Sequence, residues 1–335
     1  MSFVLPLQLM ANKLYNPFLD FKFDNKTCFL SGKALESEDE KIQVFPVWMM
    51  RIFDLEDKPF KLLDESLVTY KQLQLPCSAE VAAVISEVER KVEDAVNIGY
   101  TALKELDQLT LFQWVGKILY GVVFNEIQVG IRQAFLSGEQ LNFSQALVHK
   151  FKNLHFMLQS LITEMEFEHK NPFTILVFPV DSTPETFMYR DEINTLIFSI
   201  RMKDFAIIAT MQDNGVHEIY HDEVLAKIKG KVLHPVQFEE ICARFFYSAY
   251  LFNRLPEYTY MEVPEKVFVE PMPLNDWTLK PIFDQWTAKT YGQVLESFWK
   301  PWGYTLFEII KDPENPMSFI TDDQGEFLSD IDLAK

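Results

Sequence analysis

Cysteine is scarce in this sequence: among 335 residues, only Cys28, Cys77 and Cys242 carry a thiol. Three cysteines are too few for the disulfide framework of small secreted folds, so that class is excluded. Basic residues are also under-represented, with 31 Lys and Arg against 49 Asp and Glu, and the net charge is −18. An acidic surface of this kind repels phosphate backbones and anionic lipids, which argues against nucleic acid as a partner.

Long apolar runs are missing as well. Lys117, Asn125 and Arg132 interrupt the most hydrophobic stretch, well short of the ~20 residues that a membrane helix needs. The N-terminal stretch has no basic region, and Pro6 and Gln8 break its apolar run, so we expect no export signal. We therefore expect a cytoplasmic protein without membrane contact. GxGxxG, P-loop and GxSxG motifs are absent too, and with them the usual signs of dinucleotide-binding proteins, P-loop enzymes and α/β-hydrolases.

Aromatic residues, by contrast, are abundant. The chain has 30 Phe, 12 Tyr and 6 Trp, which a disordered protein could not leave in water. We predict an α+β fold in three parts. Residues 1–77 form a small irregular finger, residues 78–170 a helical region, and residues 171–335 a mainly antiparallel sheet with helices and a loose acidic C-terminal tail. The charge is uneven: residues 1–77 carry a net charge of −2 and the remainder −16.

Hydrophobic periodicity predicts the helices of residues 78–170. Apolar residues recur at helical spacing from Ser78, which can cap a helix, to Gly99, where the helix ends or bends. A second helix opens at Thr110 and is apolar nearly all round, which is typical of an interior helix. A third runs from about residue 144 to 165.

Strand signals begin at Pro172. Residues 193–202 and 205–211 flank a turn at Lys203, which predicts a hairpin. A strong helix then opens at Pro235, a residue type suited to the first helical turn. Two further strands surround Pro264.

Three N-terminal strings occur in a recognisable order. CFLSGK (residues 28–33) precedes QVFPVWMMRIF (43–53), and LVTYKQLQLPCS (67–78) leads into the first long helix. This order resembles a bacterial family with an HNH endonuclease-like finger of the treble-clef type. The similarity extends to residues 112–121 and 233–258. The resemblance implies a zinc knuckle and a metal-dependent site for phosphodiester cleavage.

The residues that this chemistry needs are largely replaced here. Of the knuckle cysteines, Cys28 and Cys77 remain, whereas Ser31, Ser78 and Val81 stand at the other cysteine positions, and Ile42 and Gln43 at the acidic-His pair. An amide such as Gln43 cannot act as a base near neutral pH. The resemblance therefore implies a metal-free remnant held by apolar packing, with Phe29, Val44, Phe45 and Trp48 as its expected fillers.

The leading hypothesis is thus a non-catalytic protein, derived from an HNH-like family, that acts by binding or assembly. No cofactor is predicted. The partner is unknown, and either a second copy of the chain or another protein remains open. A metal-dependent nuclease with a replaced site is the first alternative.

A second alternative comes from residues 217–221, which read H-E-x-x-H. On a helix, His217 and His221 would lie one turn apart and could share a zinc ion, with Glu218 as general base. Glu239 or Glu240 could supply a third ligand. This pattern predicts a zinc metallohydrolase. The competing interpretation is an exposed helix with two ordinary histidines.

Overall fold

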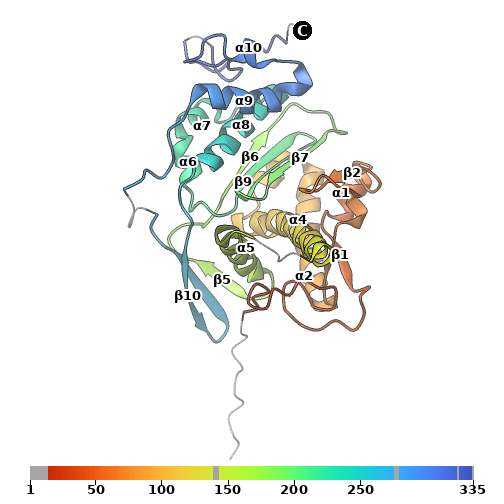
Figure 1. Cartoon of the computed structure of the whole chain (residues 1–335). Helices are drawn as coiled ribbons and strands as arrows, with labels where there is room; N and C mark the ends of the chain where they lie inside the picture. Colours follow the sequence, from red (N-terminus) through yellow and green to blue (C-terminus); the bar gives the residue numbers. More distant parts are fainter. Residues whose placement is uncertain (1–13, 139–142, 275–278, 323, 334–335) are drawn as a thin grey trace, which may run out of the picture.

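Figure 1 shows the computed structural model of the chain, which describes residues 14–138, 143–274, 279–322 and 324–333. The first 13 residues, where we expect no export signal, lie outside the described residues. The fold is α+β, as predicted, with helices and mainly antiparallel sheets. Among the helices described, none has an apolar stretch long enough to span a bilayer.

The N-terminal part consists of very short elements joined by turns. These are β1 (Lys41–Gln43), α1 (Val47–Ile52), β2 (Pro59–Lys61), β3 (Leu67–Thr69), the 3₁₀ turn η1 (Tyr70–Gln72) and β4 (Gln74–Pro76). Strand β1 pairs with β4, and β2 pairs with β3, both antiparallel. The predicted fillers are all buried: Phe29, Val44, Phe45 and Trp48 are at most 6% exposed. Apolar packing of these side chains holds the short strands together.

A layer of helices follows: α2 (Ala79–Ile98), α3 (Tyr100–Lys104), α4 (Gln108–Ser137) and α5 (Gln145–Leu158). Ser78 is the N-cap residue of α2, and Gly99 ends it with φ +113°, as predicted. Helix α4 is buried nearly all round in its first five turns. It packs tightly on the finger, because a Cβ at Gly121 would lie 2.7 Å from the Val44 methyl groups. The predicted third helix is too long: it ends at Leu158, and Glu164–Phe167 forms strand β5.

The main sheet is antiparallel, in the order β6-β9-β8-β7. Its strands are β6 (Thr174–Pro179), β7 (Phe187–Glu192), β8 (Ile197–Met202) and β9 (Phe205–Thr210). The predicted hairpin is β8–β9, with Lys203 in the left-handed region at φ +49°. Both of these strands are fully buried, since one sheet face packs on the helical layer and the other on the C-terminal helices. Strand β7 is an edge strand.

A smaller sheet has the order β10-β11-β5. Strands β10 (Tyr258–Val263) and β11 (Lys266–Pro271) are the two strands predicted around Pro264; they pair antiparallel, and β11 pairs in parallel with β5. This parallel pairing explains why the end of the predicted third helix is a strand.

The C-terminal elements cover the second face of the main sheet (Figure 1). They are α6 (Val216–Tyr220), α7 (Asp222–Ile228), α8 (Pro235–Leu251), α9 (Ala288–Trp299), η3 (Lys300–Trp302) and α10 (Leu306–Ile309). The prediction of a loose C-terminal tail is wrong for residues 318–328. Phe319 and Ile320 are buried, and Gln237 of α8 donates to the backbone oxygens of Phe319 and Leu328. Apolar residues among the acidic ones anchor this segment.

Candidate functional site

The structure brings together Cys28 and Cys77, the two cysteines that the resemblance assigns to a zinc knuckle. The turn after Cys28 closes through Gly32 N–H to Cys28 O at 3.0 Å, and Phe29 N–H donates to Pro76 O at 2.8 Å. This second bond places Cys28 beside Cys77, at the start of α2. Both thiols are buried and unoxidised.

The two thiols share a hydrogen bond. The bond from Cys77 lowers the pKa of Cys28 against the opposing effect of burial, and Ser31 and the Ser78 N–H also donate to this sulfur. The same contact, together with burial, raises the pKa of Cys77. Two thiols and the Ser31 hydroxyl do not make the closed Cys and His tetrahedron of a structural zinc site, and Val81 offers only hydrocarbon. The donor set therefore does not fit the zinc ion that the resemblance implies.

Gln43, which the resemblance places where a catalytic histidine would stand, accepts a hydrogen bond through its backbone oxygen. Lys117 of α4 is buried, and its Nζ donates to Gln43 O at 2.6 Å, to Val44 O at 2.9 Å and to Glu89 Oε1 at 2.6 Å. The Gln43 side-chain oxygen is buried without a hydrogen-bond partner. This corner of the finger thus contains an amide, which cannot act as a base near neutral pH, and a lysine paired with Glu89.

His217 lies in the interior of the protein. Its Nδ1 is 3.1 Å from Asp213 Oδ2, which also accepts hydrogen bonds from the His217 N–H and from Thr174. Burial would raise the pKa of Asp213, but these hydrogen bonds outweigh it and lower the pKa. The imidazole packs among the rings of Phe245, Phe252 and Phe283. This histidine helps to fix α6 on the protein core.

His221 is also buried, whereas Glu218 points to solvent. The Nε2 atom of His221 lies 2.9 Å from Ser248 Oγ, and burial, with smaller contributions from His217 and Arg244, lowers the pKa of His221 to about 3. The motif therefore separates its general base from its two imidazoles. A zincin needs all three groups around one metal-bound water.

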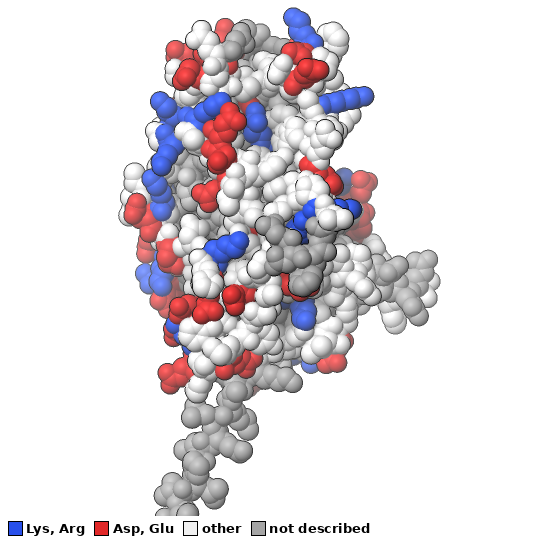
Figure 2. All heavy atoms as spheres, turned by 90° about the vertical axis from the view of Figure 1, so that its left-hand side faces the viewer, with Lys and Arg blue, Asp and Glu red and all other residues white. Residues whose placement is uncertain are grey.

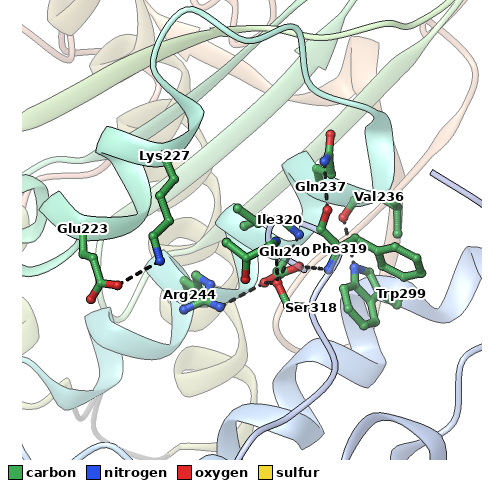
Figure 3. A network of polar contacts seen from close by, with 11 residues as sticks. Glu223, Lys227, Val236, Gln237, Glu240, Arg244, Trp299, Ser318, Phe319 and Ile320 are labelled. Atoms are coloured by element: carbon green, nitrogen blue, oxygen red, sulfur yellow. Dashed lines mark hydrogen bonds and ion pairs between the residues drawn. The ribbon is translucent and has the colours of Figure 1, made fainter. Parts of the chain in front are cut away.

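The two candidate third ligands are occupied by other partners. Glu239 lies 3.3 Å from Arg190 Nε. Glu240 accepts hydrogen bonds from Arg244, the Ser318 hydroxyl and the Phe319 N–H, as Figure 3 shows. In the described part of the chain, no three His, Cys, Asp or Glu side chains converge in a way that could hold a metal ion.

We expect zinc chloride to leave the melting temperature of the protein unchanged. Glu218→Gln should change the free energy of unfolding by less than about 0.5 kcal/mol, because Glu218 is exposed. His217→Ala should cost about 2–3 kcal/mol, because it leaves the buried Asp213 short of hydrogen-bond donors. Calorimetry and metal analysis of the purified protein test both statements. Stoichiometric zinc that is lost in His217→Ala would contradict them.

A pocket of about 690 Å³ lies along the free edge of β7. The finger forms one side of it, and α8 and α9 form the other. Its lining residues are Pro59, Phe60, Lys61, Tyr70, Tyr189, Arg190, Asp191, Glu192, Phe246, Tyr250, Val294, Ser297 and Phe298. This volume is within the range of small-molecule sites, and the lining combines aromatic rings with a few polar groups, as such sites do.

The finger side of the pocket holds an unusual carboxyl group. Burial raises the pKa of Asp191 to about 7, and the negative charges of Glu192 and Glu126 act in the same direction. Tyr189 lies two residues earlier on the same strand face, and its hydroxyl is buried without a hydrogen bond of ordinary geometry. A carboxyl group that titrates near neutral pH in a pocket is characteristic of functional sites.

The helical side of the pocket holds two further charges. Arg190 pairs with Glu239 and also lies over the ring of Phe298, 4.7 Å from its centroid. Glu192 accepts a hydrogen bond of 2.6 Å from the Tyr250 hydroxyl. Because side chains alternate along β7, Tyr189 and Asp191 face the finger while Arg190 and Glu192 face the helices.

The face that carries α6, α7 and β10 has side chains of both charges. Figure 2 shows acidic and basic side chains interspersed there, with a group of Lys and Arg beside acidic residues at the upper left. This face offers no broad basic surface of the kind that a phosphate backbone needs.

Comparisons with protein-family models, with curated proteins and with solved structures gave no match for this chain. The candidate site therefore depends on its own geometry. Sequence patterns did not indicate the β7 pocket, because its residues come from distant segments that only the fold brings together.

Proposed function

We propose that this chain is a non-catalytic, cytoplasmic binding protein, derived from an HNH-like family, that takes a small organic molecule in the β7-edge pocket. The observation that carries this proposal is the aromatic pocket itself, which Tyr189 and Asp191 line on the finger side and Glu192 on the helical side. In this view the finger has exchanged a metal-based role for a structural one. It supplies Phe60 and Tyr70 as one wall of the pocket.

The two enzymatic alternatives have less support. A nuclease would need free ligands for a divalent cation beside a base, whereas the finger corner has the Gln43 amide and a Glu89 carboxylate that is paired with Lys117. A zinc hydrolase would need Glu218 beside both imidazoles, and Glu218 lies on the opposite, exposed side of α6. The pocket, by contrast, has room, apolar walls and polar groups in one place.

A pocket-blocking variant tests the proposal. Ser297 is exposed on α9 and lines the pocket, so Ser297→Trp should fill it without disturbing the core. A panel of small ammonium ions, alcohols, carboxylates, sugars and nucleosides at millimolar concentration should include compounds that raise the melting temperature of the wild type by about 2 °C or more. Ser297→Trp should abolish these shifts.

The matched control is Ser86→Trp, which makes the same change at an exposed position on α2 that does not line the pocket. It should respond to the panel as the wild type does. The proposal is wrong if no compound stabilises the protein, or if Ser297→Trp responds as fully as Ser86→Trp.

A further inference from the structure

Aromatic rings stand on both sides of the β7-edge pocket. On the finger side, the ring of Phe60 lies 5.4 Å from that of Tyr70 and 5.9 Å from that of Tyr189, centroid to centroid. On the helical side, Phe246 and Phe298 are 5.2 Å apart. The faces of such rings attract cations, and the attraction grows where water is excluded.

The cationic groups of the pocket already have carboxylate partners. The Nε atom of Arg190 lies 3.3 Å from Glu239 Oε2, and Lys61 Nζ lies 3.1 Å from Glu65 Oε1. Arg190 lies over the ring of Phe298, so this ring already has a cationic neighbour. Because Arg190 and Lys61 are paired, they add little net positive charge to the pocket.

Two carboxyl groups of the pocket have no such partner. Among the described residues, no Lys or Arg lies within ion-pair distance of Asp191 or Glu192. Tyr250 donates to Glu192 Oε2, and the Asn194 N–H and side-chain amide donate to Glu192 Oε1; these donors are neutral and leave the charge of Glu192 in place. An anionic ligand would meet repulsion here, whereas a cationic one would gain attraction from both carboxylates and from the rings.

We propose that the β7-edge pocket binds a small organic cation, an ammonium group with methyl or alkyl substituents. Asp191 and Glu192 are its charged partners, and aromatic rings are its apolar walls. An adjoining cavity of about 300 Å³ shares Phe60, Lys61, Asp191 and Glu192 with the pocket and gives room for a longer substituent. This inference rests on the proposed function and specifies the class of ligand.

Choline and its neutral isostere 3,3-dimethylbutan-1-ol test the role of charge. The two molecules have nearly the same shape, and the quaternary nitrogen of choline is replaced by carbon in the alcohol. In calorimetric titrations of the full chain, choline should bind at least about tenfold more tightly than the alcohol. Higher sodium chloride should weaken only the binding of choline.

Variants of the two carboxylates then show which residues attract the charge of choline. Asp191→Asn keeps the size of the side chain and removes its charge, so the affinity for choline should fall toward that for the alcohol, with the part contributed by Glu192 remaining, while the affinity for the alcohol should not change. Glu192→Gln should act in the same direction and provides a second test if the first variant does not fold. Glu218→Gln, which removes an exposed charge on α6, is the matched control and should leave both affinities unchanged.

The pH dependence gives an independent readout. The titratable and charged groups around Asp191 are Tyr189 and Glu192 of β7, Tyr70 of η1, Glu126 of α4 and Lys61 of β2. Burial holds the pKa of Asp191 at about 7, so its ionised fraction increases from pH 6 to pH 8. The affinity for choline should rise up to about tenfold over this range. In Asp191→Asn it should stay nearly constant.

The outcomes separate the two proposals. If the alcohol binds as tightly as choline, and Ser297→Trp blocks both, the pocket binds ligands but the inference about charge is wrong. The inference is also wrong if choline fails while a neutral or anionic member of the panel binds. If no compound in the panel binds, both the inference and the proposed function are wrong.

Discussion

Replacing Lys117 with Met will lower the free energy of unfolding by about 3–5 kcal/mol. Lys117 is 2% exposed, and its ammonium group is held by two backbone oxygens of the finger and by Glu89 of α2. Met has similar length but no charge and no donor. The variant therefore leaves the carboxylate of Glu89, which is largely buried, without its cation and removes the donor from Gln43 O and Val44 O.

Denaturant unfolding of Lys117→Met and of the double variant Lys117→Met/Glu89→Leu tests this reasoning. The double variant removes the isolated charge, so it should recover part of the loss. The two carbonyl oxygens remain without their donor, so recovery should be incomplete. A loss below about 1 kcal/mol in Lys117→Met would show that this network does not hold the finger on α4.

The finger illustrates what a sequence can and cannot predict. The resemblance assigns Cys28 and Cys77 to one zinc knuckle, and in the structure Cys28 lies beside Cys77. The partner of Gln43 could not be foreseen, because the donor comes from Lys117, 74 residues away. In the sequence, a lysine within an apolar helix interrupts the hydrophobic pattern. Only the fold shows that this lysine is buried and paired.

Strand β7 shows a different limit. Residues Phe187–Glu192 contain no continuous apolar run, because Tyr189 and Asp191 alternate with Arg190 and Glu192 along an edge strand that faces a pocket. Periodicity finds elements that bury an apolar face, and a strand that lines a functional pocket keeps polar groups there. The aromatic alternation of Phe187 and Tyr189 is the signal that could have indicated this strand.

The H-E-x-x-H motif shows why a local pattern does not fix a site. The spacing does place His217 and His221 on the same, inner side of the chain, as a helix requires. Helix α6 ends at Tyr220, however, and both imidazoles are enclosed by aromatic rings and bound to Asp213 and Ser248. The environment of the two histidines, which the spacing does not encode, decides what they do.

Replacing Glu240 with Ala will destabilise the protein by about 3–5 kcal/mol and loosen the C-terminal segment. Glu240 is fully buried. Its Oε1 accepts from Arg244 at 3.0 Å and from the Ser318 hydroxyl at 2.8 Å, and its Oε2 accepts from the Phe319 N–H at 2.7 Å (Figure 3). Alanine leaves a buried guanidinium and two donors without this acceptor.

The loss of stability in Glu240→Ala should be largest around α9 and the C-terminal segment. Phe319 packs against Trp299 of α9, with ring centroids 5.0 Å apart, and the Trp299 Nε1–H donates to Val236 O of α8 at 3.0 Å. Release of Phe319 should therefore loosen α9, which carries the Ser297 wall of the pocket. Limited proteolysis should cut Glu240→Ala between residues 312 and 333 sooner than the wild type.

Glu223→Gln is the matched control for this experiment, because Glu223 lies near Glu240 in Figure 3 but pairs with Lys227 on the surface, with its side chain 85% exposed. An exposed pair of this kind contributes at most about 1 kcal/mol, so the control should unfold and be cleaved as the wild type is. If Glu240→Ala behaves like Glu223→Gln, the buried carboxylate does not anchor the segment. Burial and three hydrogen bonds, rather than negative charge as such, are what give Glu240 its expected effect.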